Sequence, residues 1–128
     1  MAAPAAAFAG IGESAVPKGA INSLLSEFKK FDGFSTVNIL GLHVVEYEDC
    51  DAGVRADFNS RMTRLLSDAE LLMEAKDEED TVRIYGEISE DGNKAKNCVV
   101  FVPEDYTLIC IFRSIPLKML MGAINDID

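Results

Sequence analysis

Two stretches near the C-terminal end, residues 98–102 and 108–112, are apolar without interruption. They lie in two predicted strands, 95–102 and 106–112, which are joined only by Pro103-Glu104-Asp105. A connection this short makes the two strands antiparallel. Strands with apolar side chains on both faces are typical of the interior of a sheet, or of a sheet whose second face is covered by a helix or a partner. These two strands are therefore expected either at interior positions of a sheet or beneath a covering on its second face.

Three further segments have the apolar spacing of three and four residues that is typical of amphipathic helices. The first helix is predicted between Pro17 and Gly33, the second follows Asp51 as its cap, and the third begins at Ser114 and Pro116. Their apolar positions are Ile21, Leu24, Leu25, Phe28 and Phe31 in the first, Val54, Phe58, Met62, Leu65, Leu66 and Ala69 in the second, and Leu117, Leu120, Met121 and Ile124 in the third.

The remaining strands are predicted from β-branched residues and alternation. Residues 34–47 read as one strand, with Gly41 as the position where it could break. Residues 67–76 allow two interpretations, because Ser67-Asp68-Ala69-Glu70 resembles a capping box that would prolong the helix. Alternation over residues 71–76 and 82–88 favours a hairpin instead. Asp91-Gly92 then centres the next turn.

Together these elements predict an α+β fold with a largely antiparallel sheet. The sheet would contain a C-terminal four-stranded meander plus one earlier strand, with three helices packed against it. A length of 128 residues fits one domain, predicted over residues 17–128. The small apolar residues before it predict a disordered leader or signal remnant over residues 1–16.

The charge distribution excludes several classes of function. A formal net charge of -10 would repel nucleic acid and anionic membrane surfaces. Residues 46–80 hold twelve acidic and four basic side chains, a net charge of -8, whereas residues 34–45 hold none. No run approaches the roughly 18–20 apolar residues of a membrane-spanning helix, so stable membrane insertion is not expected. The acidic clusters are interpreted as solvated turns, because the calcium-loop pattern that starts at Asp49 is not completed.

Four segments also resemble a known family: Glu70–Asp77 (ELLMEAKD), Thr81–Gly86 (TVRIYG), Val99–Asp105 (VVFVPED) and Leu108–Phe112 (LICIF). They are similar to the small exported proteins of Bacteroides-type bacteria grouped as domain of unknown function 4252. The similarity covers roughly residues 20–124, and its motifs are apolar strands and turns rather than chemical signatures. The resemblance implies secretion or residence in the cell envelope, and it implies no activity, cofactor or catalytic residue.

Few side chains are suited to catalysis or metal binding. His43 is the only histidine and lies among apolar residues, which favours a structural role. Cys50, Cys98 and Cys110 have no metal-ligand spacing, and no metal or cofactor is expected. The register of the last hairpin decides whether Cys98 and Cys110 can form a disulfide. If the residue numbers of directly opposed residues add up to 208, Cys98 faces Cys110 and a bridge is geometrically allowed. If they add up to 209, the two side chains point to opposite faces of the sheet. Free buried thiols are the favoured interpretation.

The leading hypothesis is a non-enzymatic exported domain that acts through contacts with a protein partner or as a homo-oligomer. One candidate recognition patch is Arg83, Tyr85 and Glu87, three positions on one face of a strand, whose alternative is an ordinary solvent face. A second hypothesis is a carrier of a small apolar ligand held between sheet and helices. The least favoured is a hydrolase or thiol enzyme that pairs Cys50 or Cys98 with His43.

Overall fold

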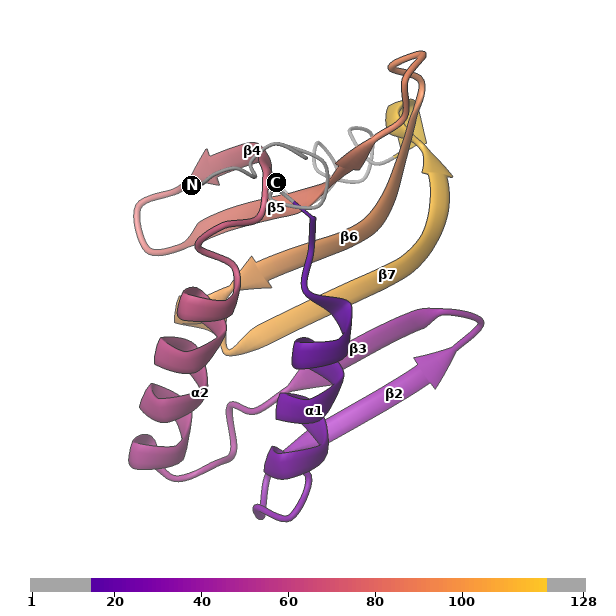
Figure 1. Cartoon of the computed structure of the whole chain (residues 1–128). Coiled ribbons are helices and arrows are strands. Elements are labelled where there is room, and N and C mark those ends of the chain that lie inside the picture. Colours follow the sequence, from indigo (N-terminus) through magenta and orange to yellow (C-terminus); the bar gives the residue numbers. More distant parts are fainter. Residues whose placement is uncertain (1–14, 120–128) are drawn as a thin grey trace, which may run out of the picture.

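The structure, a computed structural model, describes residues 15–119 and has an α+β fold. Two α-helices lie on one face of a six-stranded antiparallel sheet (Figure 1). The elements are α1 (Lys18–Phe28), β2 (Ser35–Ile39), β3 (Leu42–Glu46), α2 (Ala52–Leu65), β4 (Leu71–Lys76), β5 (Thr81–Ile88), β6 (Lys94–Val102), the 3-10 helix η1 (Pro103–Asp105) and β7 (Thr107–Pro116).

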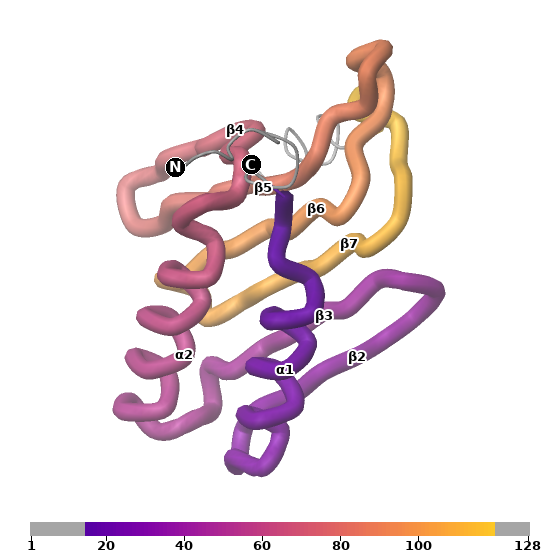
Figure 2. Tube along the Cα trace, in the orientation of Figure 1, coloured from indigo at the N-terminus to yellow at the C-terminus, as the bar shows by residue number. Residues whose placement is uncertain are grey.

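The strands are arranged in the order β2-β3-β7-β6-β5-β4. Strands β4 to β7 form the predicted meander, which includes the β4–β5 hairpin that the alternation favoured. After β3 the chain passes through α2 to β4 at the opposite edge, and the meander then returns until β7 pairs with β3 (Figure 2). The two edges of the sheet are therefore β2 and β4.

The core between the helices and the sheet is built around aromatic rings. Phe58 of α2 is fully buried, and its ring centroid lies 4.4 Å from that of Tyr47 and 5.1 Å from that of Phe28. The Tyr47 hydroxyl donates a hydrogen bond to Asn59, so the one polar atom of this buried side chain has a partner. Asp51 is the N-cap residue of α2 as predicted, although its side chain makes no capping bond. This core fixes both helices on one side of the sheet.

The prediction of a single strand over residues 34–47 was wrong. The segment folds into the β2–β3 hairpin, which makes the sheet one strand larger than expected. The turn consists of Leu40 and Gly41, whose φ angles of 50° and 85° are both positive. Turns of this kind match the twist of hairpin strands, and Asn or Gly normally occupies the first of the two positions. The sequence marked Gly41 as a possible break, but with leucine before it the break did not indicate a hairpin turn.

The start of the last helix was also predicted too early. Strand β7 continues to Pro116, which pairs with Lys94, so Ser114 and Pro116 belong to a strand. Residues 117–119 are helical, and the rest of the predicted helix lies outside the described residues. The predicted leader likewise falls mostly outside them, except that Val16 is buried in the core under the helices. No helix within residues 15–119 has the length and apolar character to cross a membrane.

Candidate functional site

A row of directly opposed apolar residues crosses the face of the sheet that α1 and α2 do not cover. The register pairs Val37 with Val44, Val44 with Ile109, Ile109 with Val100, Val100 with Ile84, and Ile84 with Met73. Residues opposite one another in antiparallel strands point to the same face. A second row pairs Ile39 with Leu42, Leu42 with Ile111, and Ile111 with Cys98. We call this side of the sheet the outer face.

The outer face is closed at one end and open at the other. Toward β5, Ile84 is 1% exposed and belongs to a second core cluster, against which Leu72 and Leu117 pack. Toward β2, exposure rises to 49% at Val37, 58% at Ile39 and 84% at Leu40. Large apolar side chains are thus left in water along one edge of the sheet. Contiguous exposed apolar surface of this kind marks contact sites more often than scattered single residues do.

The alternation along β2 is the reverse of that expected for a strand with one solvent face. Thr36 and Asn38 pair with Val45 and His43 on the helix side, whereas Val37 and Ile39 point to the uncovered side. Apart from Glu46, the last residue of β3, the hairpin lies within residues 34–45, the charge-free segment of an otherwise acidic chain. Sequence reasoning missed Val37, Ile39 and Leu40 as candidates, although the absence of charge was the signal that could have found them.

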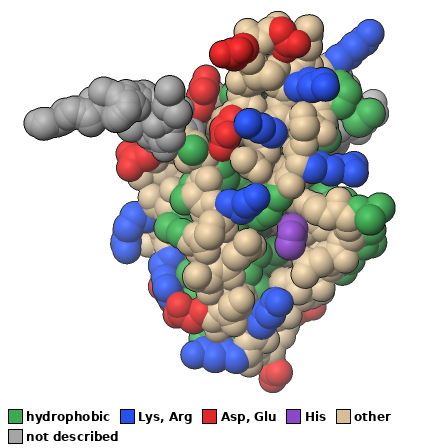
Figure 3. All heavy atoms as spheres, turned by 45° about the vertical axis from the view of Figure 1, so that its right-hand side comes forward, with side chains coloured by type: hydrophobic (Ala, Val, Ile, Leu, Met, Phe, Trp, Pro, Cys, Tyr) green, Lys and Arg blue, Asp and Glu red, His purple; other side chains and the backbone are tan. Residues whose placement is uncertain are grey.

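His43 lies within this hairpin, in β3. It is half-buried, its ring centroid lies 5.5 Å from that of Phe112, and its register partner in β7 is Cys110. The surface view shows the histidine, in purple, with apolar side chains near it, whereas acidic side chains gather at the upper and lower ends (Figure 3). The cysteine opposite His43 is therefore Cys110, whereas the hydrolase hypothesis paired His43 with Cys50 or Cys98.

The three thiols are free and buried, on different sides of the sheet. Cys110 pairs with Val99, so cross-strand pairs sum to 209 and Cys98 points to the outer face while Cys110 points to the helices. A bridge between the two within one chain is thus excluded by geometry. Burial raises the pKa of Cys98 to about 11 and that of Cys110 to about 12. Nucleophilic cysteines need the opposite shift.

We expect the thiols of the folded protein to react slowly with a disulfide reagent at pH 8. A pKa of about 11 leaves Cys98 with roughly 100-fold less thiolate than an ordinary cysteine, Cys110 with still less, and burial also blocks access. Ellman's assay measures this directly, with the urea-unfolded protein, in which all three cysteines react at once, as the control. Rapid reaction of Cys98 or Cys110 in the folded state would contradict the packing described above.

The predicted recognition residues lie on the helix-side face of β5. Arg83 donates from Nε to Oε2 of Glu74 at 2.8 Å, Tyr85 packs against the helix-side core, and Glu87 accepts a bond from Asn97 at 3.3 Å. Burial raises the pKa of the Tyr85 hydroxyl. Each of the three side chains thus has a contact of its own within the fold. Their role in recognition stays a prediction.

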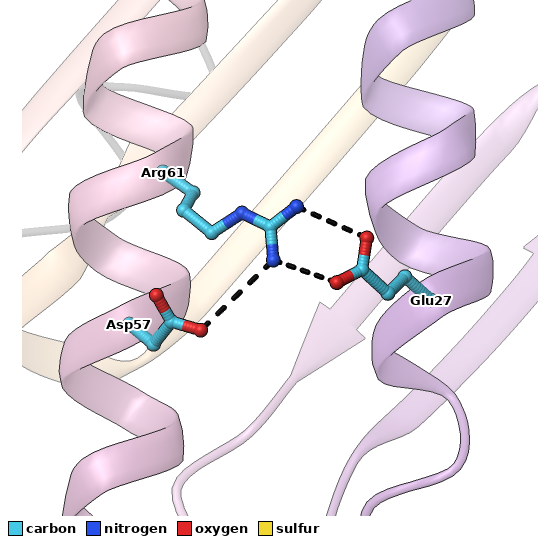
Figure 4. Close-up of polar contacts among 3 residues, drawn as sticks. All are labelled: Glu27, Asp57 and Arg61. Atoms are coloured by element: carbon cyan, nitrogen blue, oxygen red, sulfur yellow. Dashed lines mark hydrogen bonds and ion pairs between the residues drawn. The ribbon is translucent and has the colours of Figure 1, made fainter.

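A second candidate is the groove between the two helices. Arg61 of α2 donates from both terminal nitrogens to Glu27 of α1, at 2.7 and 3.0 Å, and lies 3.9 Å from Asp57 (Figure 4). The bond to Arg61 lowers the pKa of the Glu27 carboxyl. A pocket of about 400 Å³ lies beside this pair. Arg61 is already paired on both sides, so its own charge is not free for a ligand, whereas Arg64, which also lines the pocket, has no ion pair within residues 15–119.

Two other places were candidates for ligand binding. Glu46, Glu48, Asp49 and Asp105 border a polar pocket of about 300 Å³, yet within residues 15–119 no group of three or more potential ligands is arranged to hold a metal ion. On the outer face, a pocket of about 370 Å³ is lined by Glu70, Leu71, Leu72, Met73, Ile84, Ile88 and Leu117. The space between sheet and helices, by contrast, holds the aromatic core.

Comparisons with known proteins assign neither a family nor a function to this chain. The sequence matches no family model, and neither a curated protein nor a solved structure is significantly similar to it. The resemblance to the domain of unknown function 4252 family therefore stays a prediction. The open end of the outer face, formed by the β2–β3 hairpin, is the feature of the described residues that most resembles a functional surface.

Proposed function

We propose that this chain is a non-enzymatic domain that acts through protein contacts, and that its contact surface is the outer face at the β2–β3 hairpin. One observation carries the proposal: the apolar row across the sheet, buried at Ile84, continues uncovered to Val37 at the β2 edge. Each large apolar side chain transferred from water into a contact contributes about 1.5–3 kcal/mol. The family resemblance adds the proposal that the domain works in the cell envelope or outside the cell.

The thiol chemistry supports a role without catalysis. Burial holds Cys98 and Cys110 in the neutral form at physiological pH, and Cys50 is shifted in the same direction, by burial first and by neighbouring Asp51 second. A hydrolase that used these thiols would need a lowered pKa and a base within hydrogen-bonding distance. The exposed apolar hairpin, in contrast, has the composition expected at the centre of a protein contact.

Site-specific photo-crosslinking in the cells that make the protein tests this function. A photoreactive amino acid at position 39, on the outer face, is expected to form a defined protein adduct. The same amino acid at position 63, an exposed site on α2, should not form it. Adding Val37→Lys should abolish the adduct from position 39, because the charge would have to be buried in the contact. Equal adducts from both positions, or none from position 39, would refute the proposal.

A carrier function is the second candidate, and the outer-face pocket favours it. Its volume of about 370 Å³ and its lining of leucine, isoleucine and methionine suit a small apolar ligand. The site differs from that of the original hypothesis, because it lies on the other side of the sheet. Native mass spectrometry of protein purified from its own host should then show an adduct that Leu71→Lys removes, at a pocket position that is 46% exposed and outside the core. A clean apo mass would reject the carrier.

A further inference from the structure

Strand β2 is an edge of the sheet that lacks the usual protection against pairing. It is the terminal strand in the sheet order, and no other strand within residues 15–119 pairs with its outer side. Native edges are commonly blocked by lysine, proline, bulges or inward charges. Residues 35–39 contain no proline and no charge, and the β2–β3 register is continuous. The strand therefore offers free backbone donors and acceptors next to an apolar face.

The opposite edge of the sheet, strand β4, has the usual features that prevent pairing with another chain. Strand β4 carries Glu74 and Lys76, has an irregular register between Leu71 and Met73, and leads into the acidic turn Asp77–Asp80. Burial, together with the neighbouring Asp105 and Glu104, raises the pKa of Asp80, which reflects the density of negative charge there. A second acidic chain would be repelled at this edge. The two edges of one sheet thus differ in their capacity to accept a partner.

Leu40 at the tip of the hairpin is a second, independent observation. It adopts a left-handed backbone conformation with φ 50°, and its side chain is 84% exposed. A non-glycine residue pays about 1–2 kcal/mol for this conformation, and exposing leucine to water gains nothing. Asparagine would suit the turn better. Both the backbone conformation and the exposure of Leu40 are unfavourable in the isolated chain. Burial of its side chain in a contact with a partner would explain why leucine stands there.

The charge distribution identifies the occupant. Two copies of a chain with a net charge of -10 repel each other wherever acidic surfaces meet, so they can approach closely only through a charge-free surface. Residues 34–45, which make up the β2–β3 hairpin apart from Glu46, form such a surface, whereas a basic partner would be drawn to residues 46–80 instead. An edge strand is also complementary to itself when the two copies are related by a twofold axis.

Resting on the contact function proposed above, we propose that two copies of this chain form a dimer by antiparallel pairing of their β2 edges, centred on Asn38. A twofold axis perpendicular to the sheet keeps both outer faces on the same side. Side chains alternate along a strand, so an outer-face residue of one copy must lie opposite an outer-face residue of the other. Centring on Asn38 places Val37 opposite Ile39 of the second copy, and Thr36 opposite its Leu40. Asn38 then faces its own equivalent on the helix side. The two outer faces become one continuous apolar surface.

Sedimentation velocity on the full chain tests the dimer. The wild type should shift with concentration from the 14.0 kDa monomer toward twice that mass. Raising the salt concentration should strengthen association, because it screens the repulsion between the acidic surfaces while the contact itself has no charge. Ile39→Lys should raise the dissociation constant at least about tenfold, since it replaces an apolar contact by a charge. Ala75→Lys, an exposed position on the β4 edge, is the matched control and should leave it unchanged.

Two further variants separate the contact from folding. Leu40→Asn should weaken the dimer and yet raise the stability of the monomer, because asparagine tolerates the left-handed turn. Asn38→Cys should be joined to its equivalent by a short thiol crosslinker, whereas Thr36→Cys should not, and the native cysteines are buried. A monomer at all concentrations, or a dimer that Ile39→Lys does not weaken, would overturn the proposal. If the adduct from position 39 then contains a different protein, the contact function stands and only the dimer fails.

Discussion

Replacing Phe58 with alanine is expected to lower the free energy of unfolding by about 3–5 kcal/mol. Phe58 is fully buried in α2, and its ring contacts those of Phe28, Phe34 and Tyr47 with centroid distances of 5.1, 5.4 and 4.4 Å. The substitution removes the ring that joins α2 to α1 and to the residues flanking the β2–β3 hairpin, and the surrounding aromatic side chains cannot collapse into the space. Urea unfolding followed by circular dichroism measures the loss.

The control for this prediction is Met119→Ala. Met119 is 63% exposed, so its truncation should change the stability by less than about 0.5 kcal/mol. A loss below about 1 kcal/mol for Phe58→Ala would mean that α2 is not packed on the sheet as described. The helix-side core would then not be available to hold the sheet, and the assignment of the outer face as the second, uncovered side would fail with it.

Replacing Gly33 with alanine is expected to cost at least about 2 kcal/mol, through backbone crowding as well as conformation. Gly33 has φ 90°, and a Cβ atom there would lie 2.5 Å from the carbonyl carbon of Asp49 and 2.7 Å from the nitrogen of Cys50. These are backbone atoms of the loop before α2, so they cannot move aside as a flexible side chain would. The loop that leads into the β2–β3 hairpin would have to shift.

Two other glycines provide graded controls in the same unfolding assay. Gly92→Ala, at φ 77° with open space around it, should cost about 1–2 kcal/mol for conformation alone. Gly19→Ala, exposed in α1 with nothing within 4 Å, should stabilise by about 0.4–1 kcal/mol. The expected order of stability is therefore Gly19→Ala, wild type, Gly92→Ala, Gly33→Ala. Equal effects at Gly33 and Gly92 would contradict the close approach of the two loops.

Much of the fold could be predicted because local patterns and tertiary structure agree. The α+β class, the C-terminal meander and the helices α1 and α2 follow from apolar spacing and from turn residues such as Asp91-Gly92. The β2–β3 hairpin did not follow, since its turn uses Leu40, a residue that no turn pattern predicts. Pro116 misled in the other direction: proline often begins a helix, but here it ends a strand.

The candidate surface could not be predicted, because it depends on register. Tyr106 has φ 54° in the connection between β6 and β7, and with η1 it sets the sum of 209 that separates Cys98 from Cys110. Asn97, at φ 52°, then shifts the register beyond Cys98. A change of one residue moves every side chain of a strand to the other face. The sequence shows apolar strands, but only the pairing aligns Val37, Val44, Ile109 and Val100 in one row.

Hydroxyl-radical footprinting of the full chain, dilute after purification and inside the cells that make it, tests the central claim most directly. At the hairpin, Val37 and Ile39 on the outer face and Leu40 in the turn should be oxidised readily in the dilute protein and much less in the cell. Met119, which is 63% exposed and lies outside both the hairpin and the outer-face pocket, serves as the internal reference and should be oxidised equally in both. Equal oxidation of the hairpin in both states, or its protection in both, would contradict the claim that this surface is a protein contact.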